Sequence, residues 1–305
     1  MSTARIIDGT ALAASFRDRI RSRVAALRER GIGVRLDAVL VEAGDNSARV
    51  YAENQARTCA QLGIDYRLHR ITPDSEATAY DEIAGRVLLL SSDPDVSAIM
   101  LHLPLPRGVD PYRVQRLIAP EKDVEGVNPA NIGNIVYGRS SLAPCTALAV
   151  LRMIESVWTE KSDRLGVPLI HPFLRGQLVV VVGAGDVVGK PIAVILMRQE
   201  ATVVSCNKWT PGLPDLARSA DILIAAAGVP GLITPDMVKP GAVVIDVGVN
   251  RVTGSDGRTR TVGDVSFDTV SRVAGWISPV PGGVGPVTVS MLLHNVADAA
   301  EHRAR

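Results

Sequence analysis

Residues 178–197 read LVVVVGAGDVVGKPIAVILM: an apolar run, a glycine-rich turn and a second apolar run. The first run is typical of a buried strand and the second of a helix. Gly183, Gly185 and Gly189 allow a tight turn in which backbone N–H groups approach a pyrophosphate, whose charge the helix N-terminus favours. A plain strand-to-helix turn is the alternative. The position between two apolar runs favours a dinucleotide site.

The next predicted strand, residues 201–205, indicates which dinucleotide is bound. In dinucleotide-binding folds, a carboxylate after this strand holds the ribose 2′-hydroxyl. This chain continues with Cys206, Asn207 and Lys208, and has no carboxylate there. Because a lysine pairs with a 2′-phosphate, Lys208 favours NADP, with NAD as the alternative. A solvated surface lysine is the other interpretation of this residue.

Strand and helix patterns alternate along the chain, which predicts an α/β fold with parallel sheets. The length of 305 residues predicts two domains. We place the first domain at 1–146 plus 287–305 and the second at 147–286. Helices are expected at 9–30, 47–62, near 77–91, near 111–118, 147–160 and 287–304, and strands at 35–41, 64–69, 97–103, 178–182, 201–205, 222–227 and 242–247.

Composition excludes several classes of protein. The net charge is +1 and aromatic residues make up 4% of the chain, which argues against a nucleic-acid partner. The three cysteines are too few and too far apart for a disulfide framework or a zinc site, so we expect no metal. No stretch resembles a signal peptide or a membrane span, and we expect no membrane association. These features together predict a cytoplasmic protein.

Several motifs, in order along nearly the whole chain, resemble one family. They are IIDGTALA near the start, LHLPLP at 101–106, PEKDVEGVNPANIG at 120–133, PCT at 144–146, VVGKP at 187–191, VVIDVGVN at 243–250, VGDV at 262–265 and SPVPGGVGPVTVSML at 278–292. This set is similar to the methylenetetrahydrofolate dehydrogenase/methenyltetrahydrofolate cyclohydrolase family.

The resemblance implies an N-terminal α/β folate-handling domain and a Rossmann dinucleotide-binding domain, with a cleft between them. Family members oxidise 5,10-methylenetetrahydrofolate with NADP or NAD, and many hydrolyse the methenyl product to 10-formyltetrahydrofolate. They are usually homodimers that pair through the Rossmann domain. The expected cofactor-binding residues are Gly183, Ala184, Gly185, Asp186, Val188, Gly189, Lys208, Gly228, Val249 and Gly285. The expected substrate-binding residues, for a tetrahydrofolate derivative, are Tyr51, Glu125, Pro281, Gly282 and Gly283.

The proline- and glycine-rich loop at 279–286 has a physical interpretation of its own. Prolines fix φ and glycines carry no side chain, so the loop is stiff and lets flat ligands approach the backbone. A rigid interdomain hinge would show the same composition.

The expected catalytic residues are Tyr51, Gln55 and His102, and two of them differ from the family pattern. The family has Tyr-x-x-x-Lys where this chain has Tyr51 and Gln55. It commonly has glutamine at the place of His102 and aspartate at the place of Glu125. An amide exchanges no proton near pH 7, so we expect hydrolysis to be weak or absent while hydride transfer persists. His102 either compensates or is a hydrogen-bonded structural histidine.

Two further departures from the family pattern occur in the second half of the chain. Ala184 replaces an arginine that helps to bind the 2′-phosphate in many relatives. The linker before Gly183 is longer than usual at 158–176, and nothing in the sequence assigns it a role.

Three functions remain open from the sequence. The first is a folate dehydrogenase with or without cyclohydrolase activity. The second is a divergent paralogue that acts on a related folate or one-carbon substrate in a specialised pathway. The third is a non-catalytic folate- or nucleotide-binding protein, which the retained motifs disfavour.

Overall fold

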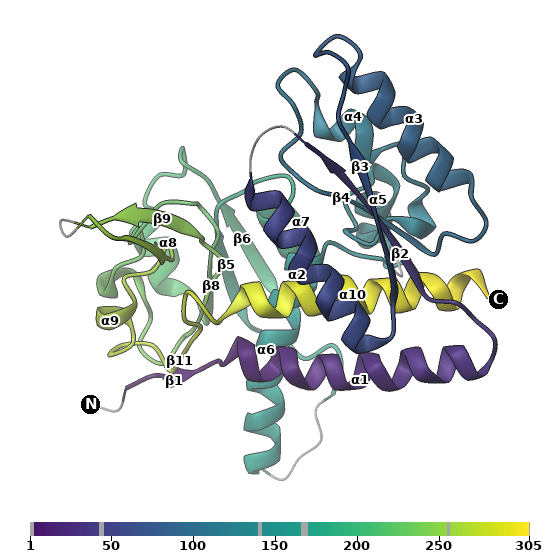
Figure 1. Ribbon diagram of the computed structural model, residues 1–305. Coiled ribbons are helices and arrows are strands. Elements are labelled where there is room, and N and C mark those ends of the chain that lie inside the picture. The colour runs from purple at the N-terminus through teal and green to yellow at the C-terminus, as the bar shows by residue number, and fades with distance from the viewer. Residues whose placement is uncertain (1–2, 43–45, 140–141, 166–169, 255–256, 305) are drawn as a thin grey trace. The chain divides into compact units, whose positions relative to one another are not determined.

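The computed structural model describes residues 3–42, 46–139, 142–165, 170–254 and 257–304. The chain forms two compact units (Figure 1). Unit 1 contains residues 1–14 and 146–291, and unit 2 contains residues 15–145 and 292–305. None of the described helices is both long enough and apolar enough to cross a membrane.

Unit 2 is built on a parallel sheet with the order β3-β2-β4. Its strands are β2 (Arg35–Val41), β3 (Asp65–Ile71) and β4 (Ala98–Leu101). The crossover helices are α2 (Asn46–Leu62) and α3 (Ala79–Ser92). Six of the seven residues of β2 are buried, as expected for the central strand of a sheet covered on both faces. These elements match the predicted alternation closely.

The segment between β4 and residue 145 contains more helix than the sequence indicated. Besides α4 (Pro111–Gln115) it forms the short 3₁₀ helix η1 (Pro120–Lys122) and α5 (Pro129–Tyr137). Neither η1 nor α5 was among the helices expected from the sequence. Asn128 caps this helix by accepting a hydrogen bond from the backbone of Ala130, and a proline follows the cap. This start signal is strong for a helix, but it lay inside a segment rich in Pro, Gly and Asn.

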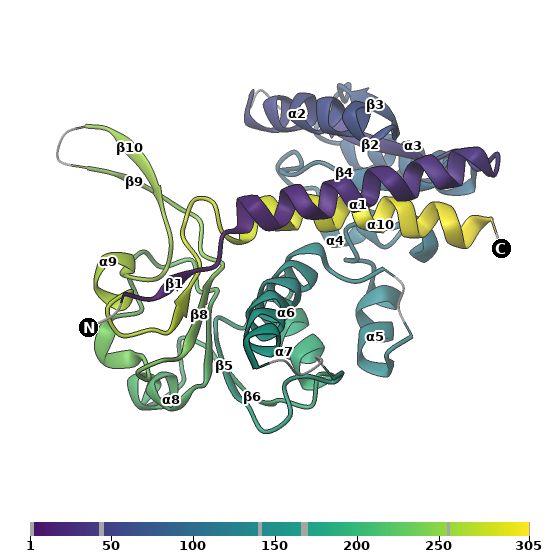
Figure 2. The ribbon, with the colours of Figure 1, turned by 90° about the horizontal axis from the view of Figure 1, so that it is seen from below.

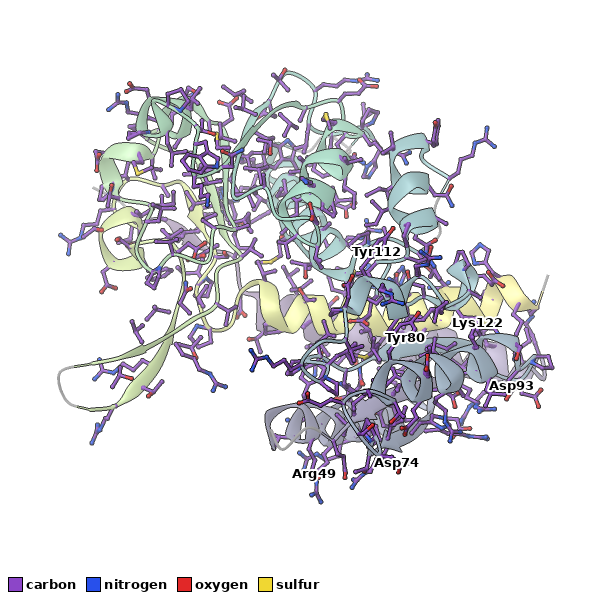
Figure 3. All side chains as sticks on the ribbon, turned by 90° about the horizontal axis from the view of Figure 1, so that it is seen from above. Arg49, Asp74, Tyr80, Asp93, Tyr112 and Lys122 are labelled. Carbon is purple, nitrogen blue, oxygen red and sulfur yellow. The ribbon has the colours of Figure 1, made fainter. Side chains whose placement is uncertain are left out.

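Lys122 joins this segment to α3 (Figure 3). Its ammonium is buried and donates to the backbone carbonyls of Ser91 and Asp93, both at 2.7 Å. These carbonyls at the C-terminal end of α3 have no partner within the helix, and a cation there also interacts favourably with the helix dipole. The contact therefore fixes the start of the loop that carries Asp123 and Glu125.

Two long helices, α1 (Gly9–Glu29) and α10 (Val284–Arg303), lie side by side in both ribbon views (Figures 1 and 2). In unit 2 they are joined by Arg23, which forms ion pairs with Asp298 and Glu301. A third long helix, α6 (Cys145–Leu165), begins at the boundary between the units and extends beyond the predicted end at residue 160.

Unit 1 contains a six-stranded sheet with the order β1-β11-β8-β7-β5-β6. Every neighbouring pair is parallel. The central strands are β5 (Leu178–Val182), β6 (Thr202–Cys206), β7 (Ile222–Ala225) and β8 (Val243–Asp246). The connections include α7 (Gly189–Met197), α8 (Leu213–Ser219), η2 (Pro235–Met237) and α9 (Phe267–Val270). Because β6 and β7 flank β5 on opposite sides, the strand order reverses at β5, as in doubly wound dinucleotide-binding sheets.

The N-terminal segment corrects the predicted domain boundaries. Strand β1 (Arg5–Ile6) pairs with β11 (Trp276–Ile277), so residues 1–14 belong to unit 1 and not to the first predicted domain. At the other end, residues 287–291 also belong to unit 1. Residues 292–305, which include the end of the last helix, lie in unit 2 together with residues 15–145. Pairing between strands 271 residues apart leaves no local signal in a two-residue strand.

A two-stranded antiparallel hairpin completes unit 1. It consists of β9 (Asn250–Thr253) and β10 (Thr259–Val262), which the sequence did not predict. Figure 2 shows this hairpin standing off from the rest of the unit. Most residues of both strands are exposed.

Candidate active site

Four predicted site residues, Tyr51, Gln55, His102 and Glu125, lie in unit 2, around the carboxyl end of β4. Tyr51 and Gln55 are one turn apart on α2, and therefore share a face of that helix. Met100 and His102 are two residues apart along β4 and its continuation, and face the same side. The ring of Tyr51 meets the edge of the His102 ring, with centroids 5.8 Å apart. The Gln55 amide contacts Met100.

Gln55 is buried, with 4% of its surface exposed. Its Nε2 donates to Met100 Sδ at 3.0 Å, while its Oε1 has no hydrogen-bond partner among the residues that the structure describes. The amide thus directs one N–H to Met100 and keeps a buried acceptor unused. Arg57 is exposed on the outer surface of α2 and pairs with Asn54, so it does not replace the missing lysine.

His102 is also buried, and its backbone N–H donates to the carbonyl of Val39. Its Nε2 lies 3.4 Å from the hydroxyl of Tyr66. Burial lowers the pKa of His102 to about 4, so the imidazole is neutral at pH 7. The observed contacts agree with a hydrogen-bonded structural histidine and make it a weak base.

Glu125 approaches β4 from the turn that follows η1. Its Oε2 accepts a long hydrogen bond, 3.4 Å, from the backbone N–H of Leu101. Burial and the nearby charge of Asp123 raise the pKa of Glu125 to about 7. Among Tyr51, His102 and Glu125, only Glu125 therefore titrates near neutral pH, since burial raises the pKa of Tyr51 to about 12.

The position of the Glu125 backbone depends on residues that the sequence analysis missed. Asp123 accepts hydrogen bonds from the backbones of Gly126 and Asn128. Asn295, fully buried on α10, donates to the carbonyl of Val124 at 2.8 Å. Of these two residues, only Asp123 could have been found from the sequence, because it lies in the KDVEG motif. Asn295 could not, because it is far from this motif in the sequence.

The predicted pyrophosphate turn lies in unit 1, between β5 and α7. Gly183 has φ +114°, and a Cβ there would lie 2.1 Å from the carbonyl oxygen of Ala226, just after β7. A Cβ on Gly189 would lie 1.8 Å from the carbonyl oxygen of Gly183. Both glycines are therefore required by close backbone approaches where the strand order reverses. A Cβ on Gly185 would meet no atom within 4 Å, so this glycine leaves open space beside the turn.

The other residues of the turn differ in exposure. Asp186 is exposed and pairs with Lys190 one turn further on. Ala184 and Val188 are partly buried. Lys208 is exposed directly after β6, with its ammonium 4.9 Å from the ring centroid of Trp209.

Gly228 and Val249 lie on two loops that Asp264 connects. The Oδ2 of Asp264 accepts hydrogen bonds from the backbones of Ala227 and Gly228, and its Oδ1 accepts one from Asn250 Nδ2. Val249, next to Asn250, is 70% exposed. Asp264 belongs to the VGDV motif, but its role as a positioning residue was not predicted.

The proline- and glycine-rich loop ends earlier than predicted, because α10 begins at Val284 and includes Gly285. Gly282 has φ +99°, which favours glycine. A Cβ on Gly9, at the start of α1, would lie 1.8 Å from the carbonyl oxygen of Gly283. The loop that carries Pro281 therefore packs tightly against the N-terminus of α1, within unit 1.

Substitution of the two turn glycines separates folding from binding. Gly183→Ala imposes a positive φ on alanine and a backbone clash, so we expect the free energy of unfolding to fall by about 2–4 kcal/mol. Gly185→Ala fits the fold and fills space beside the predicted pyrophosphate. It is expected to leave stability unchanged and to weaken NADP binding about tenfold, a loss of about 1.4 kcal/mol. Urea denaturation and calorimetric titration measure the two effects; equal behaviour of the variants would contradict this assignment.

His102 makes the stability depend on pH. Its pKa is about 4 in the folded chain and 6.5 when unperturbed, so the unfolded chain binds more protons between these values and stability falls as the pH drops through this window. From pH 7 to pH 4.5 the loss is about 2–3 kcal/mol. In His102→Gln we expect this part of the loss to disappear. Because its pKa is raised, Glu125 stabilises the folded chain as the pH falls, but it is present in both proteins and does not affect the comparison. If the free energy of unfolding, measured by urea denaturation, falls equally in the parent and the variant between pH 7 and 4.5, the prediction is refuted.

Comparison with known proteins identifies both regions of the chain. Residues 7–125 match the family model described as the tetrahydrofolate dehydrogenase/cyclohydrolase catalytic domain, and residues 144–304 match its NAD(P)-binding domain. The chain is 43% identical over 297 residues to the bifunctional protein FolD of Moorella thermoacetica, covering 97% of this chain and 99% of the relative. It is 44% identical over 303 residues to the protein of the same name from Cupriavidus pinatubonensis, covering 99% of each.

Solved structures give the same result over the whole length. The bifunctional FolD enzyme of Campylobacter jejuni superimposes with a TM-score of 0.88 at 33% identity, covering 98% of this chain and 99% of that one. The FolD enzyme of Trypanosoma brucei, solved with NADP cofactor and an inhibitor, superimposes with a TM-score of 0.84 at 33% identity, covering 100% of both chains. The chain belongs to the tetrahydrofolate dehydrogenase/cyclohydrolase family, an NAD(P)-dependent enzyme family of one-carbon folate metabolism.

Proposed function

We propose that this chain oxidises 5,10-methylenetetrahydrofolate to the methenyl cation with NADP and hydrolyses that cation slowly. The observation that carries the proposal is the composition of the site at the end of β4. There Gln55 replaces a titratable lysine, and His102 is neutral at pH 7. The relatives named bifunctional support the presence of both steps.

The oxidation step suits these residues because it needs no proton transfer. The substrate methylene loses one hydrogen together with the electron pair of its C–H bond, and the carbon becomes the methenyl cation. Bound NADP would supply the acceptor for this hydride. Tyr51, which is 42% exposed as a residue, offers an aromatic ring against which a flat pterin stacks. The Glu125 carboxylate accepts hydrogen bonds from ring N–H groups. Both residues hold the substrate in place, which is the main requirement of hydride transfer.

The hydrolysis step is more demanding. A water forms a C–O bond to the methenyl carbon, a C–N bond breaks, the ring nitrogen gains a proton and one proton leaves. Gln55 neither accepts nor releases a proton near pH 7. His102, with a pKa of about 4, is a weak base. Glu125, with a pKa of about 7, is the one titratable group among these three that could relay a proton.

A lysine at position 55 is expected to restore hydrolysis. Burial of this position would lower the pKa of the new ammonium into the range useful for proton transfer. In Gln55→Lys we expect methenyltetrahydrofolate hydrolysis to rise about 100-fold, while NADP reduction changes less than about threefold. Methenyl absorbance and NADPH absorbance report the two steps.

Asn54→Lys, which adds the same charge on the exposed side of α2, is the matched control and should change neither rate. If the unaltered chain hydrolyses methenyltetrahydrofolate rapidly and Gln55→Lys does not increase the rate, the proposal of slow hydrolysis is contradicted. Failure to reduce either NADP or NAD despite folate binding would favour a divergent substrate.

The cofactor assignment rests on Lys208. A lysine at the end of β6 supplies the cation that a 2′-phosphate requires, and the structure leaves it exposed at that position. The turn from Gly183 to Gly189 would hold the pyrophosphate through its backbone N–H groups. NAD, which lacks the 2′-phosphate, should bind more weakly.

The chain is also proposed to act as a cytoplasmic homodimer that pairs through unit 1. The β9–β10 hairpin supports this arrangement, since a two-stranded ribbon with exposed faces is marginally stable alone and has unpaired edges. A second copy of the hairpin would pair with such an edge. Three free and buried cysteines fit a reducing compartment.

Sedimentation equilibrium tests the dimer. We expect twice the mass of one chain, and a shift to the monomer mass in a double variant with Arg251→Pro and Thr261→Pro, because each proline removes a backbone donor. The concentration of about 50 µM is well above most dimer dissociation constants. A monomer mass for the unaltered chain at this concentration would refute the proposal.

A further inference from the structure

Trp209 is the most exposed tryptophan in unit 1, with 80% of its surface accessible. Tryptophan is a large, amphipathic side chain that usually buries most of its ring. Trp209 is not among the described residues that form or pack against the hydrophobic cluster around β5, β7 and β8, so its indole does not stabilise that cluster.

The backbone that carries this ring is held firmly. Asn207 Oδ1 accepts a hydrogen bond from the backbone N–H of Trp209 at 2.9 Å, and the hydroxyl of Thr210 accepts one from the backbone N–H of Asn207 at 2.9 Å. A third bond joins the backbone N–H of Thr210 to the carbonyl of Asn207 at 3.0 Å. The turn at 207–210 therefore presents the indole at a defined place.

A cation accompanies the ring. The Lys208 ammonium lies 4.9 Å from the centroid of the indole, within the range of a cation–π interaction. Aromatic surface and positive charge are thus adjacent on two consecutive residues. This combination suits a ligand with both a flat ring and an anionic group.

The turn lies next to the glycine turn. Strands β5 and β6 are paired in parallel, with Val182 opposite Cys206 (Figure 1). The backbone N–H of Gly183 donates to the carbonyl of Cys206 at 2.9 Å, just before the 207–210 turn begins. In a dinucleotide-binding sheet, the pyrophosphate lies at the first of these turns and the adenosine ribose at the end of the next strand. The adenosine end of a bound dinucleotide therefore reaches Lys208 and Trp209.

We propose that Trp209 is a stacking platform for the adenine ring of NADP, and that it acts together with Lys208, which pairs with the 2′-phosphate. We call these two residues the adenosine clamp. The proposal rests on the NADP assignment above. It adds a binding residue that contacts the adenine base, which neither the glycine turn nor Lys208 is proposed to contact. Stacking on an aromatic ring is sequence-tolerant for bases and strengthens binding substantially.

The probe is 2′,5′-ADP, which carries the adenosine and the 2′-phosphate without nicotinamide, compared with 5′-ADP. We expect 2′,5′-ADP to quench tryptophan fluorescence, and Trp209→Phe to remove the quenching while keeping binding within about threefold, because phenylalanine still stacks. Trp209→Ala should weaken both probes by about 5- to 100-fold. Lys208→Gln should weaken 2′,5′-ADP about tenfold and leave 5′-ADP unchanged.

Two control variants accompany these measurements. Lys239→Gln removes an exposed lysine of unit 1 that pairs with Asp221, and should not alter the binding of either probe. Trp158→Phe removes another tryptophan, and the quenching should persist. Calorimetric titration gives the affinities independently of fluorescence and of enzyme activity.

The outcomes distinguish the clamp from the proposed function. Unchanged affinity for both probes in Trp209→Ala, with NADP still reduced by the unaltered chain, overturns the clamp alone. Binding of neither NADP nor NAD by the unaltered chain overturns both. A larger KM for NADP with unchanged kcat in Trp209→Ala supports a binding role, since the substituted ring lies at the adenosine end and not at the reacting carbon.

Discussion

Buried carboxylates that accept hydrogen bonds from backbone N–H groups hold the loops of both units. Asp246 accepts from the backbones of Gly248, Asp264 and Val265, and Asp264 accepts in turn from Ala227 and Gly228. Loops at the carboxyl ends of parallel strands have no ladder to order them. A carboxylate that accepts several N–H groups supplies this order, and satisfies donors that would otherwise be buried without partners.

The same device positions Glu125 in unit 2. Asp123, which is fully buried, accepts from Gly126 and Asn128 and from the Asn131 amide. Its charge also disfavours ionisation of Glu125 nearby, which contributes to the raised pKa of that group. One aspartate therefore positions the carboxyl group that we propose to hold the pterin, and adds to the rise in its pKa that burial mainly causes. Loss of this aspartate would alter geometry and charge together.

Close backbone approaches form the second constraint. At Gly183, Gly189 and Gly9, an added Cβ would lie 1.8–2.1 Å from a carbonyl oxygen. These distances exclude any side chain, so the glycines are fixed by packing within unit 1 before any ligand is considered. Gly185 differs, since nothing in the protein occupies its side-chain space. Packing explains the first three glycines, and the fourth is explained by the space for a ligand that we propose beside it.

The chemistry of the site follows from what surrounds its polar groups. The amide nitrogen of Gln55 donates a hydrogen bond to Met100 Sδ. His102 is neutral because burial penalises its charged form. A site made mainly of neutral groups can hold a substrate for hydride transfer, which moves no proton. It is poorly suited to a step in which protons are gained and lost. This difference is the physical basis for the proposed imbalance between the two activities.

The sequence by itself determined the elements with local signals. The strand at 35–41 was predicted with the observed bounds, and the turn at 183–189 was placed between its strand and helix, because apolar periodicity and glycine act over a few residues. The spacing of Tyr51 and Gln55 also fixed their common helix face. Tertiary structure alone decided the partner of Gln55, the pKa of Glu125 and the assignment of residues 1–14 to unit 1. These properties depend on burial and on pairing between distant segments, neither of which leaves a local pattern.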